Sequence, residues 1–186
     1  MADAPAMGRV MVESFLSAHR GQMPEPAYQK RVAEWTPDVS ARAWARALAE
    51  RAEGQADREV FLVAEDEGGA VLGLVSGGAL EDDPCGTVAE IGALYVRPDR
   101  HGVGIGSALM SAAAARLAEQ GFVELRISVL TVNLPARAFY QAMGGSEVAQ
   151  GTVDEEGYLL PVTIYAWPDV STIVRDGGAG SSAPSP

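Results

Sequence analysis

Hydrophobic positions in the first third of the chain recur every three to four residues, the spacing of an amphipathic helix. Val12, Phe15 and Leu16 fall on one side of the first such stretch, and two prolines follow it in RGQMPEPA. Ser40 is a suitable cap for the last stretch, and Gly54 ends it. The pattern therefore predicts three helices, at 8–18, 27–35 and 40–53.

After Arg58 the hydrophobic period shortens to two, which is typical of strands. VFLVAE and AVLGLVSGG flank the turn DEGG as a hairpin, and the long strand TVAEIGALYV follows a second turn. Gly92 inside that strand favours a bulge. Downstream, the pattern predicts a helix at 104–120, a strand at 122–130, a helix at 135–143 and strands near 146–150 and 158–166. This order predicts an α/β fold with a mixed, mostly antiparallel sheet.

Length and composition favour one globular domain. We expect that domain over 1–175, with a helical segment at 8–54, a core at 59–167 and a flexible tail at 176–186. No apolar run reaches the roughly 18 residues of a membrane helix, and the N-terminus lacks a basic stretch followed by an apolar one. Cys85 is the only cysteine, which excludes an internal disulfide framework and cysteine-based zinc sites. These features predict a cytoplasmic protein without a membrane partner.

The charge distribution changes this picture more than the net charge does. The formal charge of −11 argues against a nucleic-acid partner. Residues 59–96 carry eight acids and no Lys, Arg or His, whereas residues 91–116 carry three arginines and one acid. An anionic ligand near the arginines, beside a cationic one near the acids, would suit this pattern. Two differently solvated faces would also explain it.

The arginines coincide with the segment VRPDRHGVGIGSALM, which holds three alternating glycines, Gly102, Gly104 and Gly106. They stand where a strand ends and a helix begins. The first amides of a helix lack internal partners and attract anions, and glycines let a phosphate approach them. A pyrophosphate site is thus predicted, with a plain capping turn as the alternative. The missing lysine excludes a Walker loop, and the antiparallel neighbours argue against a Rossmann fold.

Two motifs in sequence order resemble those of the GCN5-related N-acetyltransferases. ALYVRPDRHGVGIGSALM is similar to the family's strand–glycine–helix signature, and VLTVNLPARAFYQAMG to its later Asn-x-x-Ala-x-x-Phe-Tyr segment. The resemblance covers about 60–167 and implies a mixed, mostly antiparallel sheet with helices on both faces. The N-terminal third resembles the family's variable substrate-side helices.

The chain departs from the family pattern at three places. His101 stands where the family has Arg or Gln, and Gly144-Gly145 replaces its Gly-Phe. MADAPAM is a poor match to the strand that usually precedes the first helix. Either the sheet lacks that strand or the start of the chain lies further upstream.

The resemblance implies acetyl-CoA as co-substrate and no metal. The backbone of Leu94, Tyr95 and Val96 would pair with the pantetheine arm, and the amide of Tyr95 or Val96 would face the thioester oxygen. Asn133 would bond either the pantetheine or the local backbone. Arg97 and Arg100 would be available for the remaining phosphate. The pyrophosphate would bind the amides of His101, Gly102, Val103, Gly104, Ile105, Gly106 and Ser107.

Two side chains are candidates for proton transfer. An amine of pKa about 10.4 arrives charged and must lose a proton. Glu90, in AEIGALYV, matches a position where several family members place the base, although a solvated strand residue is the alternative. Regular alternation would put Gly92 and Leu94 on its face, unless a bulge shifts them. Tyr140 matches the family's acid for the coenzyme A thiolate, with core packing beside Phe139 as the alternative.

The resulting functional hypothesis is direct acetyl transfer from acetyl-CoA to a primary amine of a small molecule or a protein. No candidate nucleophile accompanies the motifs, which favours a ternary complex. One alternative is a coenzyme A-binding regulatory module without turnover, and another is an enzyme using a different acyl donor or a hydroxyl acceptor. The identity of the acceptor stays open. Exposed edge strands near the C-terminus are compatible with a homodimer.

Overall fold

The computed structural model of the 186-residue chain describes residues 4–54 and 58–173. Three helices come first: α1 (Ala4–His19), α2 (Glu25–Glu34) and α3 (Pro37–Ala52). The predicted cap of α3 is wrong. Thr36 is the cap, its side chain accepting the N–H of Val39 at 3.3 Å, while Ser40 is buried inside the helix. Proline fits the first helical position because it has no N–H to satisfy, so Pro37 lets α3 begin earlier.

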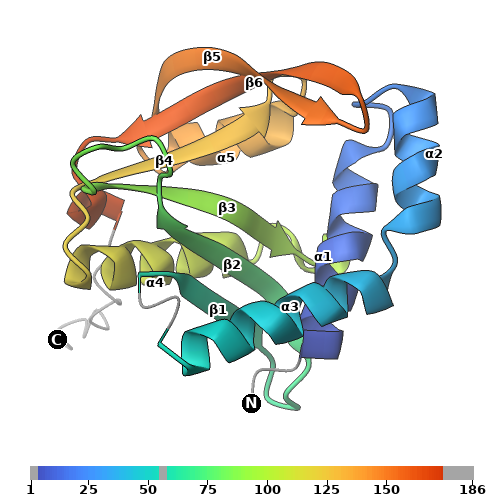
Figure 1. Ribbon diagram of the computed structural model, residues 1–186, viewed down its shortest axis with the longest axis horizontal. Coiled ribbons are helices and arrows are strands. Elements are labelled where there is room, and N and C mark those ends of the chain that lie inside the picture. Colours follow the sequence, from blue (N-terminus) through green and yellow to red (C-terminus); the bar gives the residue numbers. More distant parts are fainter. Residues whose placement is uncertain (1–3, 55–57, 174–186) are drawn as a thin grey trace, which may run out of the picture.

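Six strands form one sheet in the order β1-β2-β3-β4-β6-β5 (Figure 1). Only β3 and β4 run parallel among these neighbours in the described chain, which confirms the predicted mixed, mostly antiparallel sheet. The last two strands are longer than predicted, because their pairing continues to the tight turn at residues 155–158. The strands are β1 (Val60–Glu65), β2 (Val71–Ala79), β3 (Val88–Val96), β4 (Glu124–Leu130), β5 (Ser146–Glu155) and β6 (Tyr158–Trp167).

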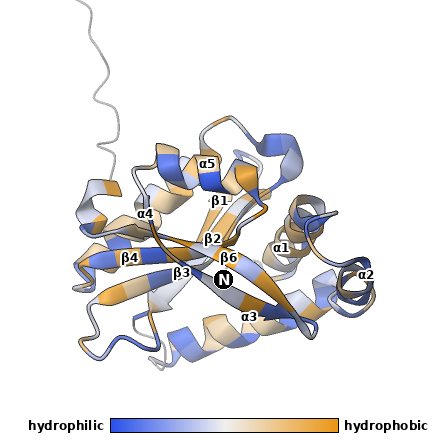
Figure 2. Cartoon of the chain, turned by 90° about the horizontal axis from the view of Figure 1, so that it is seen from above, coloured by the Kyte–Doolittle hydropathy of each residue, from blue (hydrophilic) through white to orange (hydrophobic). Residues whose placement is uncertain are grey.

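Helices cover both faces of the sheet. On one face α4 (Ile105–Glu119) and α5 (Leu134–Ala142) pack with the short helix η2 (Val170–Ile173) into the main core. On the other face α1 and α3 pack against β2 and β3, and α1 and α2 pack toward β4 and β6. Seen from above, β1, β2 and β6 carry mostly hydrophobic residues (Figure 2). We call the two sides the α4 face and the α1 face.

The parallel pairing of β3 with β4 is short. It runs from Val88↔Glu124 to Ile91↔Ile127 in the described chain. Beyond that point β3 pairs only with β2, and β4 pairs only with β6. We call this place, between residues 92–96 of β3 and 128–130 of β4, the β3–β4 gap. It leaves main-chain groups at the centre of the sheet available to a ligand.

The predicted bulge lies at Gly92, just where the gap begins. Ser76 of β2 pairs with Ala93 and Gly77 pairs with Ile91, so Gly92 is the extra residue. Because the bulge inverts the alternation, Leu94 packs on the α4 face with Ile91, and Ala93 packs on the α1 face. The regular alternation that would put Leu94 on the face of Glu90 is therefore wrong.

Candidate active site

The glycine segment forms a left-handed turn in front of α4. The short helix η1 (Pro98–Arg100) leads into it, and Gly102 and Gly104 have φ of +78° and +89°. A Cβ at either glycine would meet no described atom within 4 Å, so the space over the turn is open. Gly106 has a different role, because its Cβ would lie 3.5 Å from the ring of Phe139 on α5. The turn thus presents the first amides of α4 to the solvent.

The turn carries a positive charge that its single nearby acid only partly offsets. Asp99 pairs with Arg97 at 2.9 Å and with Arg100 at 3.7 Å. The hydrogen bond from Arg97 lowers the pKa of the Asp99 carboxyl, which therefore stays ionised. The hydroxyl of Ser107 donates to the carbonyl of Gly104 at 2.9 Å, in an exposed hydrogen bond of the first turn of α4. An anion here would meet backbone amides and two arginines.

The register of β3 decides which main-chain groups face the gap. The N–H of Arg97 donates to the carbonyl of Leu72 at 2.8 Å, so Arg97 is turned toward β2. In an antiparallel pair the direction alternates, so Tyr95 is also turned toward β2, opposite Leu74. Leu94 and Val96 point the other way, into the gap. Of the two amides considered for the thioester oxygen, that of Tyr95 points toward β2 and that of Val96 points into the gap, so the register favours Val96.

Glu90 lies on the last paired stretch of β3, immediately before the gap. Its carboxylate is half-buried and accepts a 3.3 Å hydrogen bond from the hydroxyl of Ser128 on β4. Phe61 on β1 lines the same depression, with the Trp44 ring edge-on to it at a centroid distance of 5.8 Å. A shallow depression of about 240 Å³ on this face is lined by Glu59, Phe61, Ser76, Gly77, Gly78, Ala79, Glu90 and Gly92. The alternation of polar residues in β4 could have indicated Ser128, but the pairing across β3 could not be read from the sequence.

Tyr140 is buried in an aromatic cluster on the α4 face. Its ring meets those of Phe139, Tyr165 and Trp167 at centroid distances of 5.4, 5.9 and 6.3 Å. Burial, and to a lesser degree the nearby Tyr95, raises the pKa of Tyr140 well above its ordinary range. The hydroxyl therefore keeps its proton at any physiological pH. The ring packs in the core, as the alternative reading expected, which does not prevent the hydroxyl from donating.

The departure after α5, Gly144-Gly145 in place of Gly-Phe, has a physical reason at Gly145. A Cβ at Gly145 would lie 2.6 Å from the indole ring of Trp167, so no side chain fits there. Trp167 is almost fully buried and donates from Nε1 to the carbonyl of Met143 at 2.9 Å. The indole supplied by β6 thus occupies the space of the aromatic residue missing after Gly144.

Asn133 caps α5. Its side-chain oxygen accepts the N–H of Ala136 at 3.2 Å, and the residue is buried. Of the two roles considered for Asn133, the bond to the local backbone is the one observed. It fixes the start of the helix that carries Tyr140.

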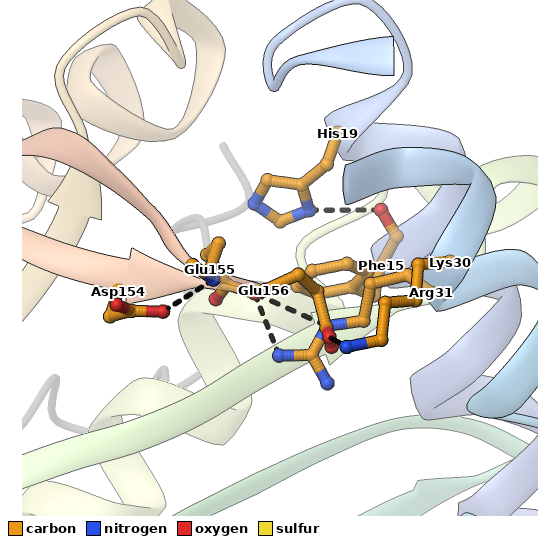
Figure 3. Close-up of polar contacts among 8 residues, drawn as sticks. Phe15, His19, Lys30, Arg31, Asp154, Glu155 and Glu156 are labelled. Carbon is orange, nitrogen blue, oxygen red and sulfur yellow. Dashed lines mark hydrogen bonds and ion pairs between the residues drawn. The ribbon is translucent and has the colours of Figure 1, made fainter. Parts of the chain in front are cut away.

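A second polar cluster on the α1 face joins segments far apart in sequence (Figure 3). Arg31 of α2 lies 5.8 Å from the ring centroid of Phe15 and binds the carboxylate of Glu155 at 2.7 Å. Burial, followed by the charge of Glu155, raises the pKa of Tyr95 to about 12. His19 donates from Nδ1 to the carbonyl of Phe15 at 2.9 Å, and burial lowers its pKa. Sequence reasoning missed this cluster because Arg31 and Glu155 are 124 residues apart.

The described residues hold neither a cluster of metal ligands nor a membrane-spanning helix. No group of three or more His, Cys, Asp or Glu is placed there to hold a metal ion. None of the helices in residues 4–54 and 58–173 is both long and apolar enough to cross a membrane. Cys85 is exposed.

Comparison with known proteins agrees with this geometry. The model of the acetyltransferase (GNAT) family matches residues 19–144. The uncharacterized N-acetyltransferase YuaI of Bacillus subtilis (strain 168) is 33% identical over 111 residues, which is 60% of this chain and 64% of YuaI. The match thus spans less than two thirds of the length of that curated relative.

Solved structures share the fold. The PaiA N-acetyltransferase of Thermoplasma acidophilum, in complex with coenzyme A, is 20% identical, with a TM-score of 0.62 over 87% of this chain and 91% of that one. The yncA protein of Salmonella typhimurium, with its cofactor acetyl-CoA, is 18% identical, with a TM-score of 0.62 over 99% and 96%. Together with the family match, which covers most of the chain, these findings establish that the chain belongs to the GNAT acetyltransferase family.

Proposed function

We propose that the chain is an acetyl-CoA-dependent N-acetyltransferase that transfers the acetyl group directly to a primary amine. The observation that carries the proposal is the β3–β4 gap, which has a different kind of site at each side. The glycine turn before α4 offers amides and arginines to an anion. The depression at Glu90, on the α1 face, offers carboxylates to a cation. Donor and acceptor would approach from opposite faces and meet in the gap.

On the donor side, the pyrophosphate would bind the turn from His101 to Ser107. The pantetheine arm would then bond the backbone of Leu94 and Val96, which faces the gap. The N–H of Val96 would stabilise negative charge on the thioester oxygen, the usual task of an oxyanion donor. Leu94 and Val96 would bind the cofactor through main-chain atoms, so the identity of their side chains matters less.

On the acceptor side, Glu90 would take a proton from the ammonium, directly or through water. The neutral nitrogen attacks the thioester carbonyl carbon to give a tetrahedral intermediate, and the extra proton that this nitrogen then carries passes to water. The C–S bond then breaks with its electron pair on sulfur, and the Tyr140 hydroxyl gives sulfur a proton. Water returns a proton to Tyr140 and receives the one held by Glu90, so both groups are restored. Because the pKa of Tyr140 is raised, its hydroxyl carries a proton at neutral pH and can donate it.

The wider setting is part of the same proposal. We place the enzyme in the cytoplasm as one domain over residues 1–175. β5 lies at the edge of the sheet and is exposed along most of its length, which would suit a homodimer. The acceptor is an amine on a small molecule or a protein.

The decisive experiment measures thiol release from acetyl-CoA with a panel of amines that includes polyamines, aminoglycosides and lysine peptides. Calorimetry on the same sample measures acetyl-CoA binding. Acceptor-dependent release supports the proposal. Tight binding without release for any amine would instead support the regulatory module, and release with propionyl-CoA or a hydroxyl acceptor alone would support the other alternative.

A further inference from the structure

The carbonyl of Val96, at the end of β3, accepts two side-chain hydrogen bonds. Ser14 of α1 donates from its hydroxyl at 3.1 Å, although the two residues are 82 positions apart. His101 of the glycine turn bonds the same oxygen from Nε2 at 2.8 Å and must donate, because a carbonyl can only accept. An acceptor-side helix and the cofactor turn therefore meet on one main-chain atom.

That atom faces the β3–β4 gap. Val96 lies opposite Gly73 at a position whose N–H and C=O point away from β2. A carbonyl oxygen has two lone pairs, and both are engaged here. A pantetheine amide that bonds this oxygen, as the proposed function requires of the β3 backbone, would be a third donor. One of the two side chains must therefore leave.

The surroundings of the two donors decide which one leaves. Ser14 is only 4% exposed, so its hydroxyl would lose a hydrogen bond in a place that water does not reach. His101 is exposed and can exchange its bond to Val96 for one to water. Displacing the imidazole of His101 therefore costs less free energy than displacing the hydroxyl of Ser14.

We propose that His101 is an exchangeable donor that occupies the pantetheine position on the Val96 carbonyl until coenzyme A binds, while Ser14 is a positioning residue that keeps this carbonyl directed into the gap. The proposal rests on the proposed function. It adds a role for the His101 side chain, beyond its backbone amide, and a role for a serine of the acceptor-side helix. Once the His101 side chain no longer bonds the Val96 carbonyl, the glycine turn would also be free to adjust to the pyrophosphate.

The direct test observes the histidine ring protons by NMR while coenzyme A is added. The chain has two histidines, so His19, bonded to Phe15 inside α1, is an internal control. We expect the Cε1–H signal of His101 to shift in a saturable manner and that of His19 to stay. Calorimetry runs in parallel. Binding with an unmoved His101 signal would overturn this inference alone, whereas no binding would overturn the proposed function and this inference with it.

Three serine variants and one histidine variant complete the test, with coenzyme A affinity and melting temperature measured for each. Ser14→Ala should weaken binding about five- to tenfold, the usual worth of one hydrogen bond, and Ser14→Thr should restore it. Ser111→Ala is the matched control, since that hydroxyl donates to the carbonyl of Ile173 at 2.9 Å, outside the proposed site. It should lower stability and leave affinity unchanged.

His101→Ala removes the competing donor, so its affinity for coenzyme A should equal or exceed that of the wild type. A loss of about tenfold or more would mean that the imidazole binds the ligand directly, which overturns the exchange. If Ser14→Ala and Ser111→Ala lose stability alike and neither loses affinity, Ser14 is structural and the positioning role is wrong.

Discussion

Gly104 holds a backbone conformation that residues with a side chain rarely adopt, and it does so under open space. Gly104→Val should therefore weaken acetyl-CoA binding by about 10- to 100-fold, because the side chain would hold the phosphates away from the amides. The strain of a left-handed Val, about 1–2 kcal/mol, would act at the same time. Calorimetry measures the affinity, and denaturant unfolding measures the strain.

Gly121 separates these two effects. It has the same φ of +89°, lies just beyond the other end of α4, and its Cβ would also meet no described atom. Gly121→Val should cost similar stability and keep full affinity. Equal affinities in the two variants would mean that the glycines of the turn serve only its shape.

Tyr140→Phe keeps the buried ring and removes only the hydroxyl. General acid catalysis contributes about 10²–10⁴-fold, so kcat should fall by that factor with little change in acetyl-CoA affinity. The melting temperature should barely move, because the buried apolar surface is nearly unchanged.

Tyr165→Phe is the matched control for a structural hydroxyl. The Tyr165 oxygen accepts bonds from Arg137 and Gln141, both at 3.3 Å. Its loss should cost about 1 kcal/mol of stability and leave kcat near normal. If Tyr140→Phe behaves like this control, another group protonates the thiolate.

Glu90→Gln preserves the shape of the side chain and its contact with Ser128, but it cannot accept a proton. Turnover should fall most at low pH, where an amine of pKa about 10.4 is almost wholly charged, and less as the pH rises toward that value. A pH profile of kcat/KM measures this. Glu59→Gln, on the rim of the same depression, should lower turnover evenly across pH if at all. An even loss for Glu90→Gln as well would make Glu90 an electrostatic residue only.

At this scale the sequence indicated residues whose role follows from local conformation. The place of Gly102 and Gly104 before a helix could be read from the sequence, whereas their positive φ could not. The bond from Ser14 to Val96 could not be predicted, because it depends on how α1 crosses the sheet. The orientation of Tyr95 depends on a bulge whose presence, but not whose effect, could be inferred.

Among the elements, α2 is the one held most by charge. Ala27 and Tyr28 are its buried residues, and the helix is bound to the β5–β6 turn by Lys30–Glu156 at 2.7 Å and Arg31–Glu155 at 2.7 Å. Replacing Glu155 and Glu156 together by Gln should speed amide exchange in residues 25–34 by at most about fivefold, because ion pairs near the surface are screened by water. Hydrogen exchange with mass spectrometry measures this.

Glu50→Gln provides the comparison for an isolated surface pair. Glu50 binds Arg46 at 2.8 Å within α3, where both side chains are well exposed. Its removal should leave exchange in α2 unchanged. If the double variant also leaves α2 unchanged, apolar packing of Tyr28 holds the helix and the ion pairs contribute little.

The order and type of the elements were predictable, but several of their ends were not. The hydrophobic period alone indicates whether a segment is a helix or a strand. Where a helix ends depends on capping, and where a strand ends depends on pairing. α3 begins at Pro37 because Thr36 caps it, and β5 extends to Glu155 because β6 pairs with it throughout. The separation of β3 from β4 is likewise a tertiary feature.

For the whole molecule, buried tyrosines give a pH dependence in the alkaline range. The pKa of Tyr95 is about 12 in the fold against an ordinary value near 10. The folded state therefore holds the proton that the unfolded state loses. This contribution is fully present below pH 10 and is lost as the pH rises through 12. Tyr95→Phe should flatten the fall in unfolding free energy between pH 10 and 12, relative to the wild type, in urea titrations. An unchanged slope would mean that the hydroxyl is solvated.

In the sequence, the two proposed ligand sites were indicated only by an uneven distribution of charge. In the structure Glu59 and Glu90 line the depression beside the gap, whereas Arg97 and Arg100 lie in the segment between β3 and α4. That acetyl-CoA would pair with the backbone of Val96 is an expectation from the resemblance. That Ser14 and His101 already use this carbonyl could not be predicted from the sequence.

The β3–β4 gap has a consequence for the abundance of the protein in the cell. If bound acetyl-CoA forms hydrogen bonds with the β3 backbone in the β3–β4 gap, it would stabilise the folded protein as well as react in it. A ligand at a hundredfold excess over its Kd adds about 2.7 kcal/mol to the stability of the form that binds it. Degradation draws on the unfolded fraction. A cell short of acetyl-CoA would then hold fewer copies of this protein, in addition to running each copy more slowly.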